Sequence, residues 1–321
     1  MLMLKKTIAA LSLLSILAAC QNDENPSQPE PKPRQDINLT RAEQEFMDKG
    51  TDFAFRFFDQ VCSTEKEKPN VFVSPLSASL CLSMITNGAT DNTLAEMQNV
   101  LGFPANTFSL DDLNNYNQKL TSALLDLDNT TQLGIANSIW IEEGFKVYDS
   151  FVDVNKKMYD AQVQELDFTS PTAKDVINQW CATQTNNCIK EVIQEIPADA
   201  RMYLINALYF KGIWKSQFDK SATGQDNFTN VDGSQQKVAM MNQTATFSYT
   251  QTDDFSIAEL PYGNEAFSMV ILLPSGDKTL DESLPNLNYE NWKQWSKNMV
   301  GKELQIKLPR FKVEYDKELE E

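Results

Sequence analysis

The chain has 321 residues, 41% of them hydrophobic, which is enough for a sizeable core, and its formal net charge is -17. It contains no histidine, so it cannot form a Ser-His-Asp triad, a Cys-His pair or an HExxH zinc site, and most hydrolase mechanisms are excluded. A surface this acidic repels phosphate backbones, and we expect no nucleic-acid partner.

The first residues have the pattern of a secretion signal. Lys5 and Lys6 supply positive charge, and residues 8–19 form an apolar run that is too short to span a membrane. The run ends in small residues followed at once by Cys20, which resembles the lipobox of bacterial lipoproteins. The alternative is an ordinary signal peptide followed by a chance cysteine.

The lipobox resemblance implies that residues 1–19 are a lipoprotein signal peptide and that Cys20 becomes the lipidated first residue. Gln21, rather than Asp, follows Cys20, which in lipoproteins disfavours retention at the inner membrane. We expect an outer-membrane lipoprotein, on the cell surface or the periplasmic face, that touches the membrane through its lipid anchor only. Residues 20–40 are rich in Pro, polar and charged side chains, which predicts a disordered tether.

The other four cysteines, Cys62, Cys81, Cys181 and Cys188, do not have the spacing of a metal site. Cys181 and Cys188 lie seven apart on a predicted helix, a rise of about 10 Å. That exceeds the roughly 7 Å that a disulfide can bridge, unless the helix ends between them. We expect all four to be buried or free thiols, and we expect no metal, no cofactor and no catalytic residue.

Helices dominate the first part of the domain. Thr40 and Glu43 predict a capping box, and a single apolar stripe follows. Residues 71–73 indicate a short strand, and Ser74 and Pro75 are typical of an N-cap and first helical turn. That helix is expected to end at residues 87–88, and two more are predicted over residues 92–101 and 110–127.

Strands dominate the rest. Strand-like residues 133–141 and 163–168 flank a helical stripe at 151–158, and another helix passes through residues 176–180. The run from Met202 to Trp214 is apolar on both faces, which predicts a central, buried strand. Further predicted strands span residues 238–274, and Phe311, Val313 and Tyr315 alternate as one more. This order predicts a single α+β domain over residues 41–321.

The helix after Ser74 has an unusual run of small residues that includes Ser77, Ser79 and Ser83. Such a face lets a sheet lie close, and its hydroxyl groups then need buried partners. Asn206 is the natural candidate, since an Asn inside an apolar strand is unfavourable unless its amide is hydrogen-bonded. The alternative is that both features are local packing. A nucleophilic role for Ser74 is disfavoured because no histidine can act as its base.

Two long segments are specific enough to suggest a protein family. Residues 70–103 read NVFVSPLSASLCLSMITNGATDNTLAEMQNVLGF, and residues 205–219 read INALYFKGIWKSQFD. They resemble helices B and C, and strand 3A with its following turn, of the serpin family. The segments 136–168, 177–193, 259–276 and 304–315 match further serpin elements in the family's order, ending at strand 6A.

The resemblance implies an α+β serpin-like fold with N-terminal helices, a large mixed main sheet and two smaller sheets. It also implies site residues. Asn70, Ser74, Pro75, Ser77 and Asn206 fall where serpins have the shutter, in which helix B hydroxyls and a strand Asn meet beneath the main sheet. Trp214 falls at the breach, where the reactive loop enters that sheet; plain core burial is its other interpretation.

Serpins, as the resemblance implies, are not enzymes. A protease cleaves their reactive loop, the loop inserts as a new strand in the main sheet, and the protease is trapped. We expect the full-length protein to inhibit a serine-type, or else cysteine-type, endopeptidase in this way. The loop follows strand 6A in the family, so we expect this chain to be truncated after that strand and to lack the reactive bond, and therefore not to inhibit by itself.

Two other functions have less support in the sequence. The alternative is a noninhibitory serpin-like surface lipoprotein that binds a ligand or partner. A carboxylate-based hydrolase would need two acidic residues that converge in a pocket, and nothing in the spacing of the acidic residues indicates such a pair.

Overall fold

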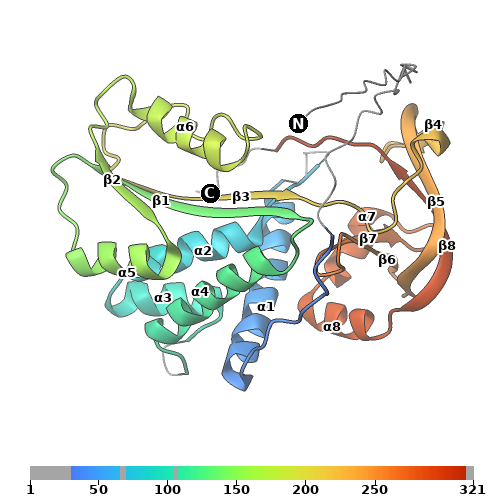
Figure 1. Ribbon diagram of the computed structural model, residues 1–321, viewed down its shortest axis with the longest axis horizontal. Coiled ribbons are helices and arrows are strands. Elements are labelled where there is room, and N and C mark those ends of the chain that lie inside the picture. The colour runs from blue at the N-terminus through green and yellow to red at the C-terminus, as the bar shows by residue number, and fades with distance from the viewer. Residues whose placement is uncertain (1–29, 66–69, 105–106, 316–321) are drawn as a thin grey trace, which may run out of the picture. The chain divides into compact units, whose positions relative to one another are not determined.

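The computed structural model describes residues 30–65, 70–104 and 107–315 (Figure 1). Cys20, the signal segment and the part of the predicted tether before residue 30 lie outside the described residues. Residues from Pro31 onward form one unit by the density of their contacts. Among the described residues, no helix is both long and apolar enough to cross a bilayer.

Four helices come first, as the sequence predicts. Thr40 and Glu43 form the expected capping box, with Glu43 N donating to Thr40 Oγ1 at 3.3 Å and Thr40 N donating to Glu43 Oε2 at 2.7 Å. Pro75 occupies the first turn of its helix, and Gly102 ends the third in the left-handed conformation. The helices are α1 (Arg41–Thr64), α2 (Pro75–Thr86), α3 (Asp91–Leu101) and α4 (Leu110–Asp126).

A three-stranded sheet follows, with the order β2-β1-β3. The first pair of strands is parallel and the second antiparallel. Helices cover both faces: α6 lies on one, and α2 and α5 lie on the other (Figure 1). The elements are β1 (Gln132–Glu142), α5 (Asp149–Tyr159), β2 (Gln162–Leu166), α6 (Ala173–Gln184) and β3 (Met202–Lys211).

Successive residues of β1 point to opposite faces, and both faces are buried. Ile139 and Ile141 pack among residues of α2 and α5, while Trp140 packs against Ile177 and Trp180 of α6. All three β1 residues are at most 3% exposed. This two-sided burial explains why three consecutive residues of the strand, 139–141, are all apolar.

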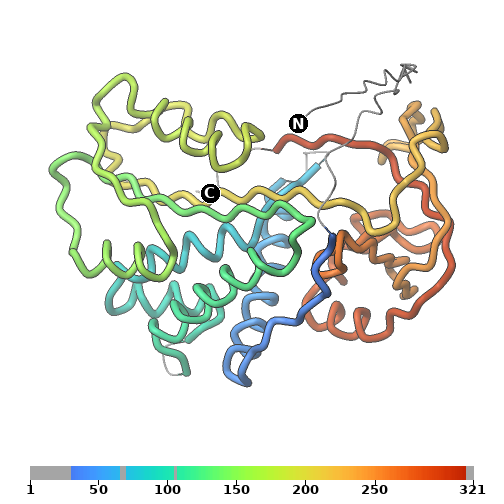
Figure 2. The backbone as a smooth tube through the Cα atoms, in the orientation of Figure 1, coloured from blue at the N-terminus to red at the C-terminus, as the bar shows by residue number. Residues whose placement is uncertain are grey.

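Five more strands form the second sheet, in the order β4-β5-β6-β7, with β8 paired to β5. Figure 2 follows the chain through these strands and the short helices that join them. The elements are β4 (Gly224–Thr229), β5 (Gln235–Gln251), β6 (Phe255–Pro261), β7 (Ser268–Pro274), α7 (Leu280–Ser283), α8 (Tyr289–Lys297) and β8 (Val300–Pro309).

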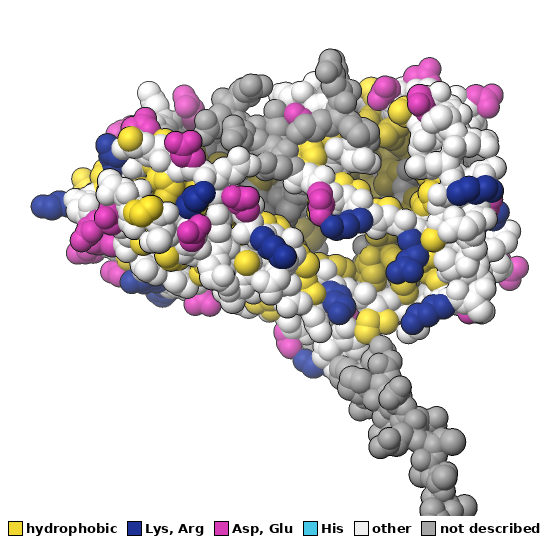
Figure 3. Space-filling view, turned by 90° about the horizontal axis from the view of Figure 1, so that it is seen from above, with side chains coloured by type: hydrophobic (Ala, Val, Ile, Leu, Met, Phe, Trp, Pro, Cys, Tyr) yellow, Lys and Arg dark blue, Asp and Glu magenta, His cyan; other side chains and the backbone are white. Residues whose placement is uncertain are grey.

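On the face of the molecule seen in Figure 3, acidic and basic side chains are interspersed.

The strands expected in two smaller sheets are hydrogen-bonded here into one. The reason is the length of β5, whose 17 residues pair with β4 near the start, with β8 along the middle and with β6 at the end. A single long strand thereby joins what the sequence predicts as separate sheets.

Strand β3 is not central, which corrects one prediction. In the described part of the chain it pairs with β1 along one edge only, and β1 is the middle strand. Its residues are apolar on both faces because helices cover both: Met202 and Leu204 pack toward α2 and α5, while Tyr203 and Ile205 pack toward α6. An apolar pattern on both faces of a strand indicates that helices cover both faces of the sheet. It does not indicate that the strand has a neighbouring strand on each side.

Two short predicted strands are also absent from the described residues. Residues 71–73 and 311–315 are not hydrogen-bonded as strands, and β8 ends at Pro309. Arg310 N still donates to Ala239 O at 2.9 Å, but the ladder stops there. A strand needs a partner edge, and neither segment has one among the described strands, even though each has the alternating pattern.

Candidate functional site

The start of α2 has the geometry that its sequence predicts. Ser74 caps the helix, its Oγ accepting from Ser77 N at 3.3 Å, and the two hydroxyl oxygens lie 2.8 Å apart. Both hydroxyls are therefore satisfied locally, and Ser79 Oγ donates to Leu76 O at 2.9 Å. Asn70 and Ser74 are exposed, while Pro75 and Ser77 are half-buried.

Asn206 has a different partner from the one predicted. Its Nδ2 donates to Asn137 Oδ1 at 2.8 Å, and the two residues lie directly opposite each other on β3 and β1. The Oδ1 of Asn206 is buried and accepts no hydrogen bond from the residues described. The structure therefore does not join Asn206 to a hydroxyl of α2: those of Ser74, Ser77 and Ser79 bond within their own helix, and Ser83 bonds to Tyr159.

Cys81 is the α2 residue that meets Asn206. Burial raises the pKa of the Cys81 thiol to about 11, and a hydrogen bond from the Asn206 backbone partly opposes this rise. All four cysteines in the described residues are free, as predicted. Helix α6 ends at Gln184, between Cys181 and Cys188, which leaves Cys181 buried and Cys188 exposed.

A network of buried polar groups extends from Asn137 to the helices. Asn137 Nδ2 donates to Tyr159 O at 2.7 Å, and Tyr159 Oη donates to Asn114 Oδ1 at 2.7 Å. Asn114 and Asn87 exchange two hydrogen bonds, of 2.8 and 3.1 Å, between α4 and the end of α2. Burial raises the pKa of Tyr159 to about 12, so its hydroxyl stays protonated.

Sequence reasoning singled out Asn206 but missed the rest of this network. The signal that marks Asn206, an Asn within an apolar strand, is also present at Asn137 in the run LGIANSIWI. Tyr159 and Asn114 carry no such signal, because Tyr and Asn are ordinary residues on amphipathic helices. The network links β3, β1, α5, α4 and α2 in one series of hydrogen bonds.

Trp214 lies where the chain leaves β3 for the second sheet. Its ring stacks on Tyr262, with centroids 4.4 Å apart and an interplanar angle of 17°, and its backbone forms an isolated bridge to the same residue. Gly263 N donates to Ile213 O at 2.8 Å. A Cβ at Gly212 would lie 2.6 Å from the Tyr262 ring, so only glycine fits there.

A second contact between the sheets centres on Asp128, which is 4% exposed and follows α4. Its carboxylate accepts from Thr130 N and Oγ1, from Thr131 Oγ1 and from Asn264 N, at 2.7 to 3.4 Å. Burial acts to raise the pKa of Asp128, but these donors outweigh it and hold the pKa below its usual value. Gly263 (φ +38°) has no room for a Cβ, which would lie 2.1 Å from Asp128 Oδ2.

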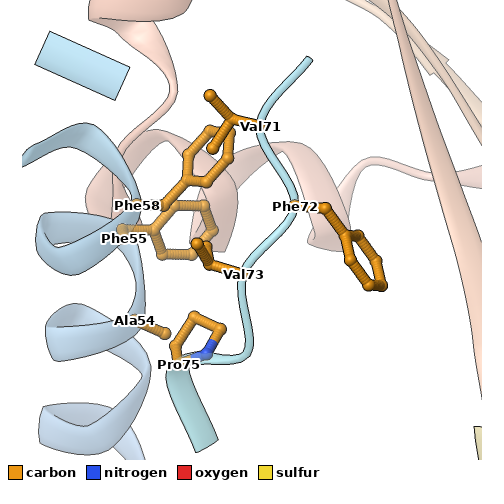
Figure 4. Close-up of a pocket in the computed structure, with 7 residues that line it drawn as sticks. All are labelled: Ala54, Phe55, Phe58, Val71, Phe72, Val73 and Pro75. Atoms are coloured by element: carbon orange, nitrogen blue, oxygen red, sulfur yellow. The ribbon is translucent and has the colours of Figure 1, made fainter. Parts of the chain in front are cut away.

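An apolar pocket of about 240 Å³ lies between α1 and residues 71–75. Figure 4 shows Val71 and Val73 facing Phe55 and Phe58 of α1, while Phe72 points the other way. Successive side chains of this extended segment thus point to opposite sides, which leaves Phe72 69% exposed. In the described residues, no group of His, Cys, Asp or Glu side chains could hold a metal ion.

Comparison with known proteins agrees with the resemblance seen in the sequence. The family model described as Serpin (serine protease inhibitor) matches residues 48–321. A serpin-like protein of Methanosarcina acetivorans is 33% identical over 274 residues, which cover 83% of this chain and 63% of that protein. Human Serpin B3 is 30% identical over 291 residues, covering 84% of this chain and 74% of that one.

Solved structures of serpins also resemble this chain in fold. The latent state of the thermophilic serpin tengpin superposes with a TM-score of 0.77 and 31% identity, covering 88% of this chain and 74% of that chain. This chain spans 58 to 74% of the length of the curated relatives that it matches.

Proposed function

The chain belongs to the serpin family, and we propose that the whole protein inhibits a serine-type or cysteine-type endopeptidase by inserting its cleaved reactive loop into the main sheet. Serpins are not enzymes, so no catalytic residue is assigned. The target protease is the partner. The resemblance places the loop after the segment at residues 310–315, so the proposal concerns the whole protein and not the matched residues alone.

The observation that carries the proposal is the second edge of β3. Along its ten residues, from Met202 to Lys211, the strand pairs with β1 on one side only, in the described part of the chain. The other side therefore presents backbone N–H and C=O groups to any strand that comes alongside. Residues of α2 and α6 pack on the two faces of β3, so an added strand would enter between the helix layers.

Two contacts support the roles proposed for the shutter residue Asn206 and the breach residue Trp214. The Asn206–Asn137 pair holds β3 to β1, and the Asn206 Oδ1 that accepts no hydrogen bond is an acceptor available to an inserted strand or to its supporting residues. At the end of β3, Trp214 stacks on Tyr262 and connects the strand to the second sheet. Asn70, Ser74, Pro75 and Ser77 would then act by setting the position of α2 beneath the sheet.

The test begins with the coding sequence beyond codon 321. A continuation of about a quarter of a domain with a Thr/Ala-rich hinge is expected. The extended protein and this chain would each be mixed with trypsin-like, elastase-like and papain-like proteases. We expect an SDS-stable complex with the extended protein and none with this chain. A stable complex formed by this chain would contradict the mechanism, since no loop would be available to insert.

The second candidate, a noninhibitory lipoprotein that binds a ligand or partner, is favoured by one observation. The pocket beside Pro75 is apolar, and Phe72 next to it is exposed (Figure 4). A stop codon directly after codon 321, together with no complex against any of the three protease classes, would support this candidate instead.

The proposal also includes a lipid anchor at Cys20 that places the protein in the outer membrane, on the surface or periplasmic face. It is supported by the lipobox resemblance of the sequence before Cys20. Metabolic labelling with a palmitate analogue should label the wild-type protein in the outer-membrane fraction and leave Cys20→Ala unlabelled. Cys188→Ala, at an exposed cysteine of the folded domain, is the matched control and should label normally.

A further inference from the structure

A second cavity, also of about 240 Å³, lies among α1, α2, the end of α3 and α4. It shares Ala54 and Pro75 with the pocket of Figure 4 but faces the other helices. Apolar side chains such as Phe53, Leu76 and Phe103 form most of its wall. An engineered apolar cavity of about 150 Å³ is known to hold benzene, so this cavity has room for a slightly larger ring system.

Gly50 is the first sign that this cavity is built rather than accidental. It lies in the interior of α1, where glycine destabilises a helix by about 1 kcal/mol relative to alanine. No backbone reason requires it, because its φ is not left-handed and a Cβ would meet nothing within 4 Å. What Gly50 does is line the cavity and leave that space open.

The second sign is Asn117, which also lines the cavity and is 7% exposed. Its Nδ2 donates to Tyr159 Oη at 3.3 Å, which fixes the amide from the side of the buried polar network. Its Oδ1 accepts no hydrogen bond from the residues described. This oxygen is not sealed from water, and a ligand N–H or O–H that reaches it would take the place of a water molecule.

The remaining wall indicates the class of ligand. Three aromatic rings, those of Phe53, Phe103 and Tyr116, line the cavity, and aromatic pairs gain stabilisation beyond the area they bury. In the described part of the chain, no charged side chain lines the cavity, so an ionised ligand would be desolvated there without a partner. The cavity therefore suits an uncharged aromatic molecule.

We propose that the cavity among α1, α2 and α4 binds a small, uncharged aromatic molecule of the indole or phenol class, whose single N–H or O–H donates to Asn117 Oδ1. The site is separate from the sheet edge that the proposed function uses, so either proposal can fail without the other.

Indole and benzofuran make a matched pair of probes, since they have nearly the same shape and only indole has an N–H group. Each would be titrated against the full chain by ligand-observed NMR. We expect indole to bind in a saturable manner and benzofuran to bind about 5-fold more weakly, the difference that one hydrogen bond makes. Absence of saturable indole binding at millimolar concentration overturns the proposal.

Variants then locate the site. Gly50→Leu fills the cavity and should abolish binding, while Gln60→Leu adds the same side chain at an exposed position of α1 and should leave it unchanged. If Gly50→Leu does not fold, Gly50→Ala should still fold and weaken binding measurably. In Asn117→Ala the preference for indole over benzofuran should disappear. Unchanged affinity in Gly50→Leu, or a retained preference in Asn117→Ala, overturns the assignment.

Discussion

The two sheets of the molecule differ in how far their faces are covered by other parts of the protein. The three-stranded sheet has helices on both faces, and Ile139, Trp140 and Ile141 of its middle strand are almost fully buried. The five-stranded sheet buries residues such as Phe247, while Thr244 and Thr246 beside it are exposed. The first sheet lies between two layers of helices, whereas the second has one face exposed to solvent.

This difference decides how polar groups behave in each region. Asn137 and Ser138 of the first sheet, and Tyr159 of the helix α5 that packs on it, are buried, and hydrogen bonds within the protein must satisfy them. In the second sheet Lys307 and Asp226 pair at 2.9 Å with about half of each side chain in water, where such a pair contributes little. Polar residues should therefore matter far more to stability in the first sheet.

The largest expected effect tests apolar burial. Ile139→Ala should destabilise the protein by about 2–5 kcal/mol, because Ile139 is 0% exposed and a cavity would remain. Ile306→Ala on β8, which is only half-buried, should cost about 1–2 kcal/mol. Urea unfolding of both variants measures the difference, and equal losses would show that the two sheets are not buried differently.

The next prediction concerns Tyr159. Removing its hydroxyl in Tyr159→Phe should cost about 1–3 kcal/mol, since Asn117 Nδ2 then loses its acceptor in a buried site. Tyr249→Phe is the matched change in the five-stranded sheet, where the hydroxyl makes only long contacts of 3.4 Å. It should cost less than about 0.5 kcal/mol. A smaller loss at Tyr159 than at Tyr249 would contradict the network.

Asp128 joins the two sheets, and its effect should depend on pH. Its folded-state pKa is below the unfolded value, so its contribution is present above the unfolded pKa of about 3.9 and is lost as the pH falls through the folded pKa. Asp128→Asn should therefore lower the unfolding free energy by about 1–2 kcal/mol at pH 7. The gap from wild type should shrink below about pH 4. Denaturant unfolding at pH 7, 4 and 3 measures the difference in stability between wild type and Asp128→Asn. A difference that does not change with pH would show that the charge of the Asp128 carboxylate does not stabilise the fold.

The smallest effect is expected at the other junction, where Trp214 stacks on Tyr262. A double-mutant cycle with Trp214→Leu and Tyr262→Leu should give a coupling of about 0.5–1.5 kcal/mol. Phe145, an exposed side chain on the loop before α5, makes no ring contact with Trp214, so Trp214→Leu with Phe145→Leu should couple by nearly zero. Equal coupling energies in the two cycles would show that Trp214 is not a specific link between the sheets.

Much of the architecture could be predicted from local signals. The capping box at Thr40, the Ser74-Pro75 helix start and the glycine stop at Gly102 are short-range patterns, and the structure has each of them. The partner of Asn206 could not be predicted in this way. The small face of α2 and the amide of Asn206 suggested a contact, but the hydroxyls at the start of α2 are equally able to bond within their own helix, and they do.

The amino-acid sequence by itself determined the family, the order of elements, the absence of histidine chemistry and the need for a partner at Asn206. The family came from the resemblance of segments such as 70–103 and 205–219 to serpin elements, and the rest came from caps, periodicity and composition, which act over a few residues. Tertiary structure decided that the partner is Asn137, that β1 rather than β3 is the middle strand, and that residues 71–73 and 311–315 have no ladder among the described strands. Each of these depends on which edges and faces meet across long separations, where several pairings satisfy the same local pattern and packing selects one.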